Sequence, residues 1–524
     1  MTNFIQGNPY FETGDWLVIL AYLIGIIALG VWFGKGQKNT RDYFLGSKNI
    51  PWWGIGFSIV AAETSALTVI GVPGQAYRDD LGFIQMIIGY VIARIILAVV
   101  MVPHYFKGEI YSPYQLFENR LGPSARRTAG GLFLVSETLA AGVRVYVACI
   151  PIQLMLGIRI LPAIVLFVLL SLVYTCVGGV KAVIWTDAVQ LGLFLAGGIF
   201  TLLYIPQLFD GGFNEVFSFA AQHGKLTWLN THFSLAPPFN LWMGVIGATV
   251  QVMSSHGAEQ LIVQRVLACK TVADGRKALV LSAVLVFPLF LIFLLVGALL
   301  WVYYQKFPLA IPLPESSPGI QANDYIYPIF MLTAVPNILK GFLIVAILSA
   351  AMSSVSSALT SLSSVATMDF VKAMLAKARS EEFYLRFSRI STIGWAALLI
   401  LVAVLTQHAR SVLNAAFALR GLGSGALLGG LFLAVFWKRG RALPVIVGMA
   451  VSLAVMTAIH TLPKMDWSKE WWSRQVGPEI FWPWYTLMGA LITLGVAFGT
   501  SLLVRSRSGL RLVEQRAEDP GRVP

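Results

Sequence analysis

The residues best suited to hold an ion are hydroxyls gathered inside an apolar run. Between Ser349 and Ser364 the chain reads SAAMSSVSSALTSLSS, which places eight serines and one threonine in a stretch that is otherwise apolar from Phe342 to Phe370. A hydroxyl gains little by facing lipid, so these side chains should face protein, water or an ion. The run therefore predicts a polar stripe on a membrane-spanning helix.

The spacing of these hydroxyls puts several of them on one face of that helix. Ala350, Ser353 and Ser354 stand at positions i, i+3 and i+4, and Ser353, Ser356 and Ser357 repeat the pattern one turn later. Neutral oxygens that converge in this way suit a hard monovalent cation. The alternative is that small residues let helices pack closely, while each hydroxyl bonds back to its own helix.

Two other apolar runs contain polar interruptions. The segment AAETSA (residues 61–66) sets Glu63 and two hydroxyls in the middle of one run, with GVPG (residues 71–74) following, and SSHGAEQ (residues 254–260) interrupts another. Small, polar and helix-breaking residues in such positions are typical of helices that unwind within a membrane. The alternative is that either segment marks an ordinary helix end.

The elements that must position these residues follow from composition. The 524 residues are 57% hydrophobic and only 12% charged, which excludes a soluble globular protein and indicates an all-α polytopic membrane protein. Apolar runs of about 20 residues predict thirteen transmembrane helices, which start near Trp16, Trp52, Phe83, Thr128, Ile160, Ala182, Phe239, Ala278, Pro336, Ser388, Ser411, Leu443 and Trp484.

The distribution of positive charge predicts the orientation of the chain. With the N-terminus outside, 26 of the 38 lysines and arginines fall in segments on the inner side and 8 on the outer side. We therefore expect a multi-pass protein of the plasma (inner) membrane with its C-terminus in the cytoplasm. The net charge of +13 then reflects topology and contact with the lipid bilayer, so nucleic acid is not an expected partner.

Other site chemistries have little support in the sequence. The three cysteines imply no disulfide framework, and the six histidines are scattered without metal-ligand spacing. We find no nucleophile and base pairing within the runs, so the protein is not expected to be an enzyme. No cofactor and no obligate protein partner are expected.

The two interrupted runs open two successive groups of five helices. Paired interrupted helices in corresponding positions of two halves indicate an inverted-repeat transporter with its binding site near the middle of the membrane. The expected organisation is an N-terminal segment with a first extra helix (1–51), a first repeat (52–206), an external loop (207–238), a second repeat (239–437), two C-terminal extra helices (438–504) and a cytoplasmic tail (505–524).

Four stretches in order resemble the sodium:solute symporter family, in its bacterial type. They are GGVKAVIWTDAVQ (178–190), EQLIVQRVLACK (259–270), SAAMSSVSSALTSLSSVATMD (349–369) and LLGGLFLAVFWKRG (427–440). The family includes sodium–glucose, sodium–iodide, sodium–monocarboxylate and sialic acid transporters. The resemblance implies a leucine-transporter-type core of five plus five helices, with one extra helix before it and two after it.

The resemblance also implies where sodium, the coupling ion, binds. A first site would use the backbone carbonyls of Ala61, Thr64 and Ala350 together with the hydroxyls of Ser353 and Ser354. A second site, found in some members, would use Asp187 of the Trp-Thr-Asp motif with Ser353, Ser356 and Ser357, giving two sodium ions per substrate. The alternative for Asp187 is a helix-start carboxylate near the cytoplasmic surface.

The solute is expected to be a small organic molecule. Just after the unwound segment, where sugar-transporting relatives have polar residues, this chain has Leu67 and then Thr68, and GVPGQAYR (71–78) resembles the iodide, monocarboxylate and vitamin branch. The residues expected to line the solute cavity are Glu63, Ser65, Thr68, Phe83, Gln85, Arg144, Ser255 and Gln260.

Arg144 is a charged residue in the middle of a predicted span. A guanidinium at that depth needs a partner, which is a substrate carboxylate, Glu63 or Glu137. We favour a pair with Glu63 over recognition of an organic anion. Sialic acid transporters use an arginine about one turn earlier, near Ala140, so the role does not carry over by position.

The sequence thus predicts a secondary active sodium:solute symporter that imports a small organic solute by alternating access. An organic anion such as a monocarboxylate or a sialic acid is the expected solute. A sugar or polyol is the alternative within the same class. From another class, the alternative is a solute sensor that shares the fold without transporting.

Overall fold

The protein is described by a computed structural model that covers residues 10–313, 322–375, 377, 379–408 and 410–518. Every regular element within these residues is a helix, and none is a strand. Helices suit a chain of this composition because only helices and closed barrels satisfy their backbone hydrogen bonds inside lipid.

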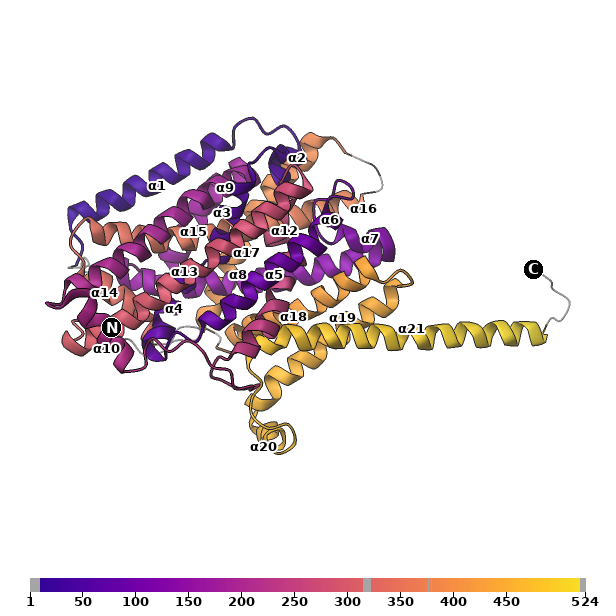
Figure 1. Ribbon diagram of the computed structural model, residues 1–524. Helices are drawn as coiled ribbons and strands as arrows, with labels where there is room; N and C mark the ends of the chain where they lie inside the picture. Colours follow the sequence, from indigo (N-terminus) through magenta and orange to yellow (C-terminus); the bar gives the residue numbers. More distant parts are fainter. Residues whose placement is uncertain (1–9, 314–321, 376, 378, 409, 519–524) are drawn as a thin grey trace.

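The helices follow one another along the whole chain (Figure 1). The first group is α1 (Thr13–Phe33), α2 (Thr40–Leu45), α3 (Trp52–Glu63), α4 (Ala66–Arg78), α5 (Ile84–Val100), α6 (Val102–Tyr105), α7 (Gln115–Leu121), α8 (Pro123–Leu156) and α9 (Ile160–Gln207). The middle group is α10 (Gly212–Gln222), η2 (Met243–Ala248), α11 (Thr249–Gly257), α12 (Gln260–Leu267), α13 (Val272–Lys306) and α14 (Ile326–Ala334). The last group is α15 (Leu339–Val365), η4 (Ala366–Val371), α16 (Lys372–Met374), α17 (Glu381–His408), α18 (Arg410–Phe436), α19 (Ala442–Thr461), α20 (Asp466–Gln475), η6 (Trp482–Trp484) and α21 (Tyr485–Glu518).

Seven helices of the described chain are long and apolar enough to cross a membrane, judged by length and composition. They are Thr13–Phe33, Ile160–Gln207, Val272–Lys306, Leu339–Met374, Glu381–Thr406, Ala442–Lys464 and Trp482–Leu503. A bent pair, Trp52–Glu63 with Thr68–Arg78, makes an eighth, and Ile84–Val100 and Gly421–Phe436 are shorter apolar helices. The count of thirteen stays a prediction.

The long helices run roughly side by side as one bundle with two ends (Figure 1). At one end lie α10 and α14, and at the other lie α2, α7 and α16. The last helix, α21, continues to Glu518 and projects beyond the bundle, past residue 504 where the last span was expected to end.

The 48-residue helix α9 is long because it joins two segments at a break. Gly179 has φ 54° and ψ −155° inside it, a conformation that favours glycine. A Cβ at Gly179 would also lie 2.4 Å from the carbonyl oxygen of Tyr43. The second segment, after this break, carries Asp187.

Close helix crossings depend on glycine, and the crossing of α5 with η2 is among the tightest. A Cβ on Gly89 would stand 2.0 Å from the carbonyl oxygen of Gly244, and a Cβ on Gly244 would stand 2.0 Å from that of Gln85. Small residues at such crossings let two backbones approach and pack in a membrane.

We therefore expect Gly244→Ala to destabilise the protein by about 1–3 kcal/mol, because the added methyl meets backbone rather than a flexible side chain. Thermal melting of the purified protein in detergent measures the effect. Gly192→Ala is the matched control, since a Cβ at Gly192 meets nothing within 4 Å. Equal melting temperatures for the two variants would show that the crossing of α5 with η2 accommodates the added methyl group without loss of stability.

Candidate functional site

The first interrupted run does unwind, at Thr64 and Ser65 between α3 and α4. Both residues are extended, and the axes on either side differ by 58°. The Ser65 N–H donates to Thr68 Oγ1 (3.3 Å), and the Thr68 N–H donates to the Ser65 carbonyl (2.9 Å). Since a continuous helix would direct these two N–H groups to the carbonyls of Ala61 and Thr64, the break releases both carbonyls from the helical ladder.

The serine stripe lies on α15, where it is almost wholly enclosed by other helices. Several hydroxyls bond back to their own helix: Ser354 donates to the Ala350 carbonyl (3.1 Å), and Ser356 and Ser357 donate to the Ser353 carbonyl (3.0 and 2.7 Å). The packing alternative therefore accounts for part of the stripe. Ser353 differs, because its hydroxyl leaves the helix and reaches another element.

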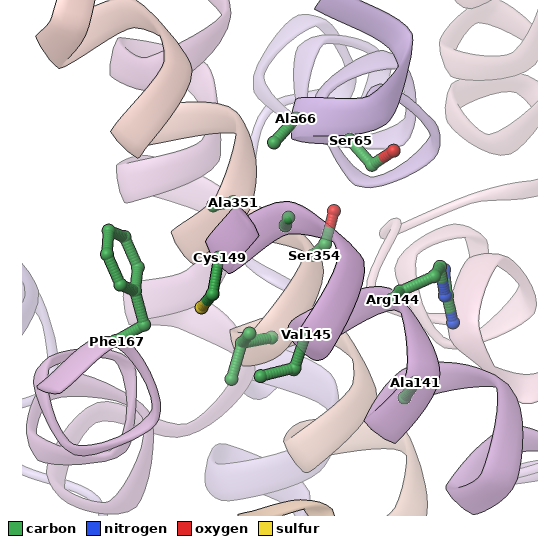
Figure 2. A pocket seen from close by; sticks show the side chains of 11 residues that line it. Ser65, Ala66, Ala141, Arg144, Val145, Cys149, Phe167, Ala351 and Ser354 are labelled. Carbon is green, nitrogen blue, oxygen red and sulfur yellow. The ribbon is translucent and has the colours of Figure 1, made fainter. Parts of the chain in front are cut away.

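The unwound segment and the stripe meet at a small cavity of about 20 Å³. Ser65 from the unwound segment, Ser354 from α15 and Arg144 from α8 are among the residues that line it. Figure 2 shows the Ser354 hydroxyl directed toward the segment that carries Ser65 and Ala66, with Arg144 to one side. The space is large enough for one water-sized species.

Asp187 is the centre of a buried polar cluster. Its Oδ1 accepts from the Ser353 hydroxyl (2.6 Å), and its Oδ2 accepts from the Ser58 hydroxyl (2.6 Å) and from Arg265 Nη2 (2.8 Å). The Asp187 side chain is fully buried, and that of Arg265 is 3% exposed. The cluster joins α3, α9, α12 and α15, so Asp187 lies inside the bundle rather than at a surface.

A larger central cavity of about 490 Å³ lies between α3, α8, α11 and the last helices. Its lining includes Glu63, Arg144, Ser255 and His256. Behind this lining Arg94 is fully buried and pairs with Glu63, and its Nη2 also lies 3.1 Å from His256 Nε2. The second interrupted run supplies this wall, since the chain breaks at Ala258 and Glu259 between α11 and α12.

The expected pair between Arg144 and Glu63 is wrong. Arg144 forms an ion pair with Glu137, two turns earlier on α8, and its Nε donates to the Ala140 carbonyl (3.3 Å). Glu63 pairs with Arg94 on α5 instead. Arg144 and Glu137 can form an ion pair because residues seven positions apart lie on the same face of a helix.

Phe83 and Gln85 lie away from the central cavity. Both line a separate cavity of about 730 Å³ beside the segment that follows α10. Gln85 is fully buried and binds the Gly82 carbonyl and the Asn230 N–H, while Phe83 stacks with Phe290 at 5.9 Å. Trp482 lines both cavities and so stands between them.

That segment is fixed over the cavity by Lys225. The ammonium group donates to the carbonyls of Tyr77 and Asp79, both at 2.8 Å, at the end of α4. Burial lowers the pKa of Lys225, and the nearby charges of Asp79 and Asp80 act in the opposite direction.

Two other expected cavity residues have structural partners. Gln260 is fully buried at the start of α12, where its amide nitrogen donates to the Tyr111 carbonyl (2.7 Å) and to Ser364 (3.1 Å). The Thr68 hydroxyl accepts from Ser65 N–H at the break. Of the eight residues expected to line the solute cavity, the structure places Glu63, Arg144 and Ser255 on the central cavity, and Ser65 on the small one.

The fold and these sites agree with comparisons to known proteins. The profile of the sodium:solute symporter family matches residues 43–451, so the chain belongs to this family. It is therefore a sodium-coupled transporter of small solutes in a membrane, and not an enzyme.

Its relatives include sialic acid transporters. It is 31% identical to the sodium/sialic acid symporter SiaT of Proteus mirabilis over 85% of this chain and 89% of that one. It is 26% identical to the human sodium/iodide cotransporter over 86% of this chain and 70% of that one.

Solved structures give the same picture. A sodium-coupled sialic acid symporter in a substrate-bound outward-open state, described as having a novel sodium site, is 27% identical, with a TM-score of 0.81 over 94% of this chain and 98% of that one. The nucleobase-cation symporter Mhp1 in a closed conformation shares the fold at 13% identity, with a TM-score of 0.57 over 88% of this chain and 94% of that one.

Two contributors to these sites were not anticipated from the sequence. Arg265 lies in EQLIVQRVLACK, a stretch that carries the family resemblance but was assigned no site residue apart from Gln260, yet all eight residues of α12 are buried. Ser58, which binds both Asp187 and Arg265, lies in an apolar run without any distinguishing neighbour. The signal for Arg265 was an arginine beside Gln264 within a short, mainly apolar stretch, LIVQRVL.

Proposed function

We propose that the solute is a sialic acid or a closely related polyhydroxylated carboxylate, imported with sodium. The observation that carries the proposal is the position of Arg144, which lines both the small cavity beside Ser354 and the central cavity. Its side chain is 15% exposed, so a carboxylate that enters the central cavity meets a guanidinium, the group best suited to bind it in two parallel hydrogen bonds.

The other residues that line the central cavity suit the polar groups of such a solute. Glu63, Ser255 and His256 line the same cavity as Arg144, and they offer acceptors and donors for hydroxyl and amide groups. The cavity volume of about 490 Å³ falls within the range of sites for small organic ligands. The relatives named for sialic acid transport support the same solute class.

We infer that sodium binds at the two sites expected from the family resemblance. For the first, Ala61 and Thr64 contribute the carbonyls released at the helix break, and Ala350, Ser353 and Ser354 of α15 complete the ligand set. For the second, Asp187 supplies a carboxylate with Ser353, Ser356 and Ser357. Unwound backbone and packed hydroxyls together give the oxygen ligands that a hard cation prefers.

The organisation in the membrane is part of the proposal. Thirteen spans result if α9 counts as two and the broken α3–α4 and α11–α12 pairs count as one each. The two breaks then open the repeats at residues 52–206 and 239–437, flanked by the extra helices. Following the positive-inside rule, the end with α10 and residues 207–238 faces outward, and the end with α16 and the tail after residue 504 faces the cytoplasm.

We expect Arg144→Ala to raise the solute concentration needed for half-maximal stabilisation by about 10- to 100-fold, because a charge-assisted bond contributes about 1.5–3 kcal/mol. The measurement is the melting temperature of the purified protein with N-acetylneuraminic acid in sodium chloride and in choline chloride. Arg127→Ala, on the exposed face of the same helix, is the matched control.

The same assay across solutes tests the class. Stabilisation by N-acetylneuraminic acid that needs sodium and needs Arg144 supports the proposal. Unchanged affinity in Arg144→Ala would remove the carboxylate role of this residue. Stabilisation by neutral sugars or polyols, with no response to any carboxylate, would instead establish the alternative solute class.

A further inference from the structure

We propose that Arg265 is a tethered cation that competes with sodium for Asp187, so that sodium enters the second site only when Arg265 leaves it. The inference rests on the proposed second sodium site and adds a residue that the expected ligand set does not contain. Arg265 would then be the group that links occupancy of this site to the position of α12.

The guanidinium occupies the space among the expected sodium ligands. Arg265 Nη2 lies 2.8 Å from Asp187 Oδ2 and 2.5 Å from the Ser357 hydroxyl oxygen. Its Nε donates to the Ser58 hydroxyl at 2.8 Å, and that hydroxyl in turn donates to Asp187. Two members of the expected set, Asp187 and Ser357, are thus already bound to a positive charge.

Charge balance makes the two occupants exclusive. Asp187 is fully buried and Arg265 is 3% exposed, and together they are neutral. A sodium ion added to the intact pair would leave a net positive charge on side chains that are shielded from bulk solvent, which is strongly unfavourable. When sodium replaces the guanidinium at Asp187, the buried site is neutral again. Burial of the site therefore favours exchange of one cation for the other over binding of both.

The position of Arg265 on α12 connects this exchange to conformational change. α12 is the half of the broken second-repeat helix that follows the break at Glu259, and it packs against α3 and α15. Arg265 holds it there through Ser58 on α3, Asp187 on α9 and Ser357 on α15. Sodium at Asp187 therefore favours a state in which these three contacts of α12 are absent, and a ligand with different affinity for two states shifts their populations.

Binding of radiolabelled sodium to the purified full-length protein tests the exchange. We expect Arg265→Gln to bind the second sodium ion about tenfold more tightly than the parent, because the competitor has lost its charge. Arg265→Lys keeps the charge and should stay near the parent value. Arg276→Gln is the matched control, since Arg276 Nε donates to the Ala98 carbonyl of α5 and not to a member of the Asp187 cluster.

The melting temperature in sodium chloride and in choline chloride shows whether Arg265 competes with sodium or has only a structural role. If Arg265 is a competitor, Arg265→Gln has a lower melting temperature than the parent in choline chloride and recovers in sodium chloride, where sodium neutralises Asp187. Equal loss in both salts, or unchanged or weaker sodium binding, would overturn the inference.

The variant Asp187→Asn distinguishes this failure from failure of the proposed site. If Asp187→Asn still binds as many sodium ions as the parent, the second site itself is wrong, and the exchange with it. If it binds one fewer while Arg265→Gln binds with parental affinity, the site stands and only the exchange is wrong.

Discussion

Replacing Ser353 with alanine is expected to raise the sodium concentration for half-maximal transport by about 10- to 100-fold, the largest effect of any single hydroxyl in the protein. Ser353 belongs to both proposed sodium sites, and its fully buried hydroxyl donates to Asp187 Oδ1 at 2.6 Å. Loss of one bond to a charged group costs about 1.5–3 kcal/mol. Sodium-dependent uptake into proteoliposomes measures the effect.

Ser361→Ala provides the control for this prediction. Ser361 is equally buried on the same helix, but its hydroxyl bonds only to the Ala358 carbonyl among the contacts described, at 3.0 Å. We expect near-normal sodium dependence and a small change in melting temperature. If both variants lose sodium dependence to the same degree, the serine stripe acts through helix packing rather than through ion binding.

Much of this architecture is predictable from the sequence because the membrane imposes simple rules. A hydroxyl-rich stripe in hydrocarbon must face inward, and α15 is enclosed as expected. The interruption at AAETSA breaks the helix at Thr64 and Ser65, within the predicted segment. Each prediction depends only on local residue types and on the cost of burying unpaired polar groups.

The partners of buried charges are not predictable in the same way. Arg144 was expected to pair with Glu63 but pairs with Glu137, and Glu63 pairs with Arg94. Arg144 and Glu137 share one face of α8, but whether Glu63 meets Arg94 or Arg144 depends on how α3, α5 and α8 are rotated about their axes. The sequence carries no direct record of those rotations.

Which cavity each residue lines also depends on packing between helices that are distant in the sequence. Phe83 and Gln85 flank the first residue of α5, and both were expected to line the same cavity as Glu63, yet they line a separate cavity with Trp482. Trp482 comes from the lead-in to α21, a helix outside the predicted repeats. A contact between two elements so distant in the chain has no local sequence signal.

The double variant Asp187→Asn/Arg265→Gln is expected to transport with one sodium ion fewer than the parent, with a Hill coefficient for sodium near one in place of about two. Removing one partner of a buried ion pair costs about 3–5 kcal/mol, whereas removing both charges leaves no uncompensated ion. The double variant therefore tests ion binding without the instability that Asp187→Asn alone introduces. Uptake against sodium concentration in proteoliposomes gives the Hill coefficient.

The steady-state gradient of solute provides an independent measure of the same change. Each sodium ion that crosses a potential of 100 mV contributes about 2.3 kcal/mol, so the loss of one ion lowers accumulation about 50-fold from voltage alone. A variant that still folds and binds solute but accumulates as steeply as the parent would show that no coupled ion passes through Asp187. Reduced accumulation with an unchanged melting temperature would show that the second coupled sodium ion binds at Asp187, because the fold and the first site are then intact.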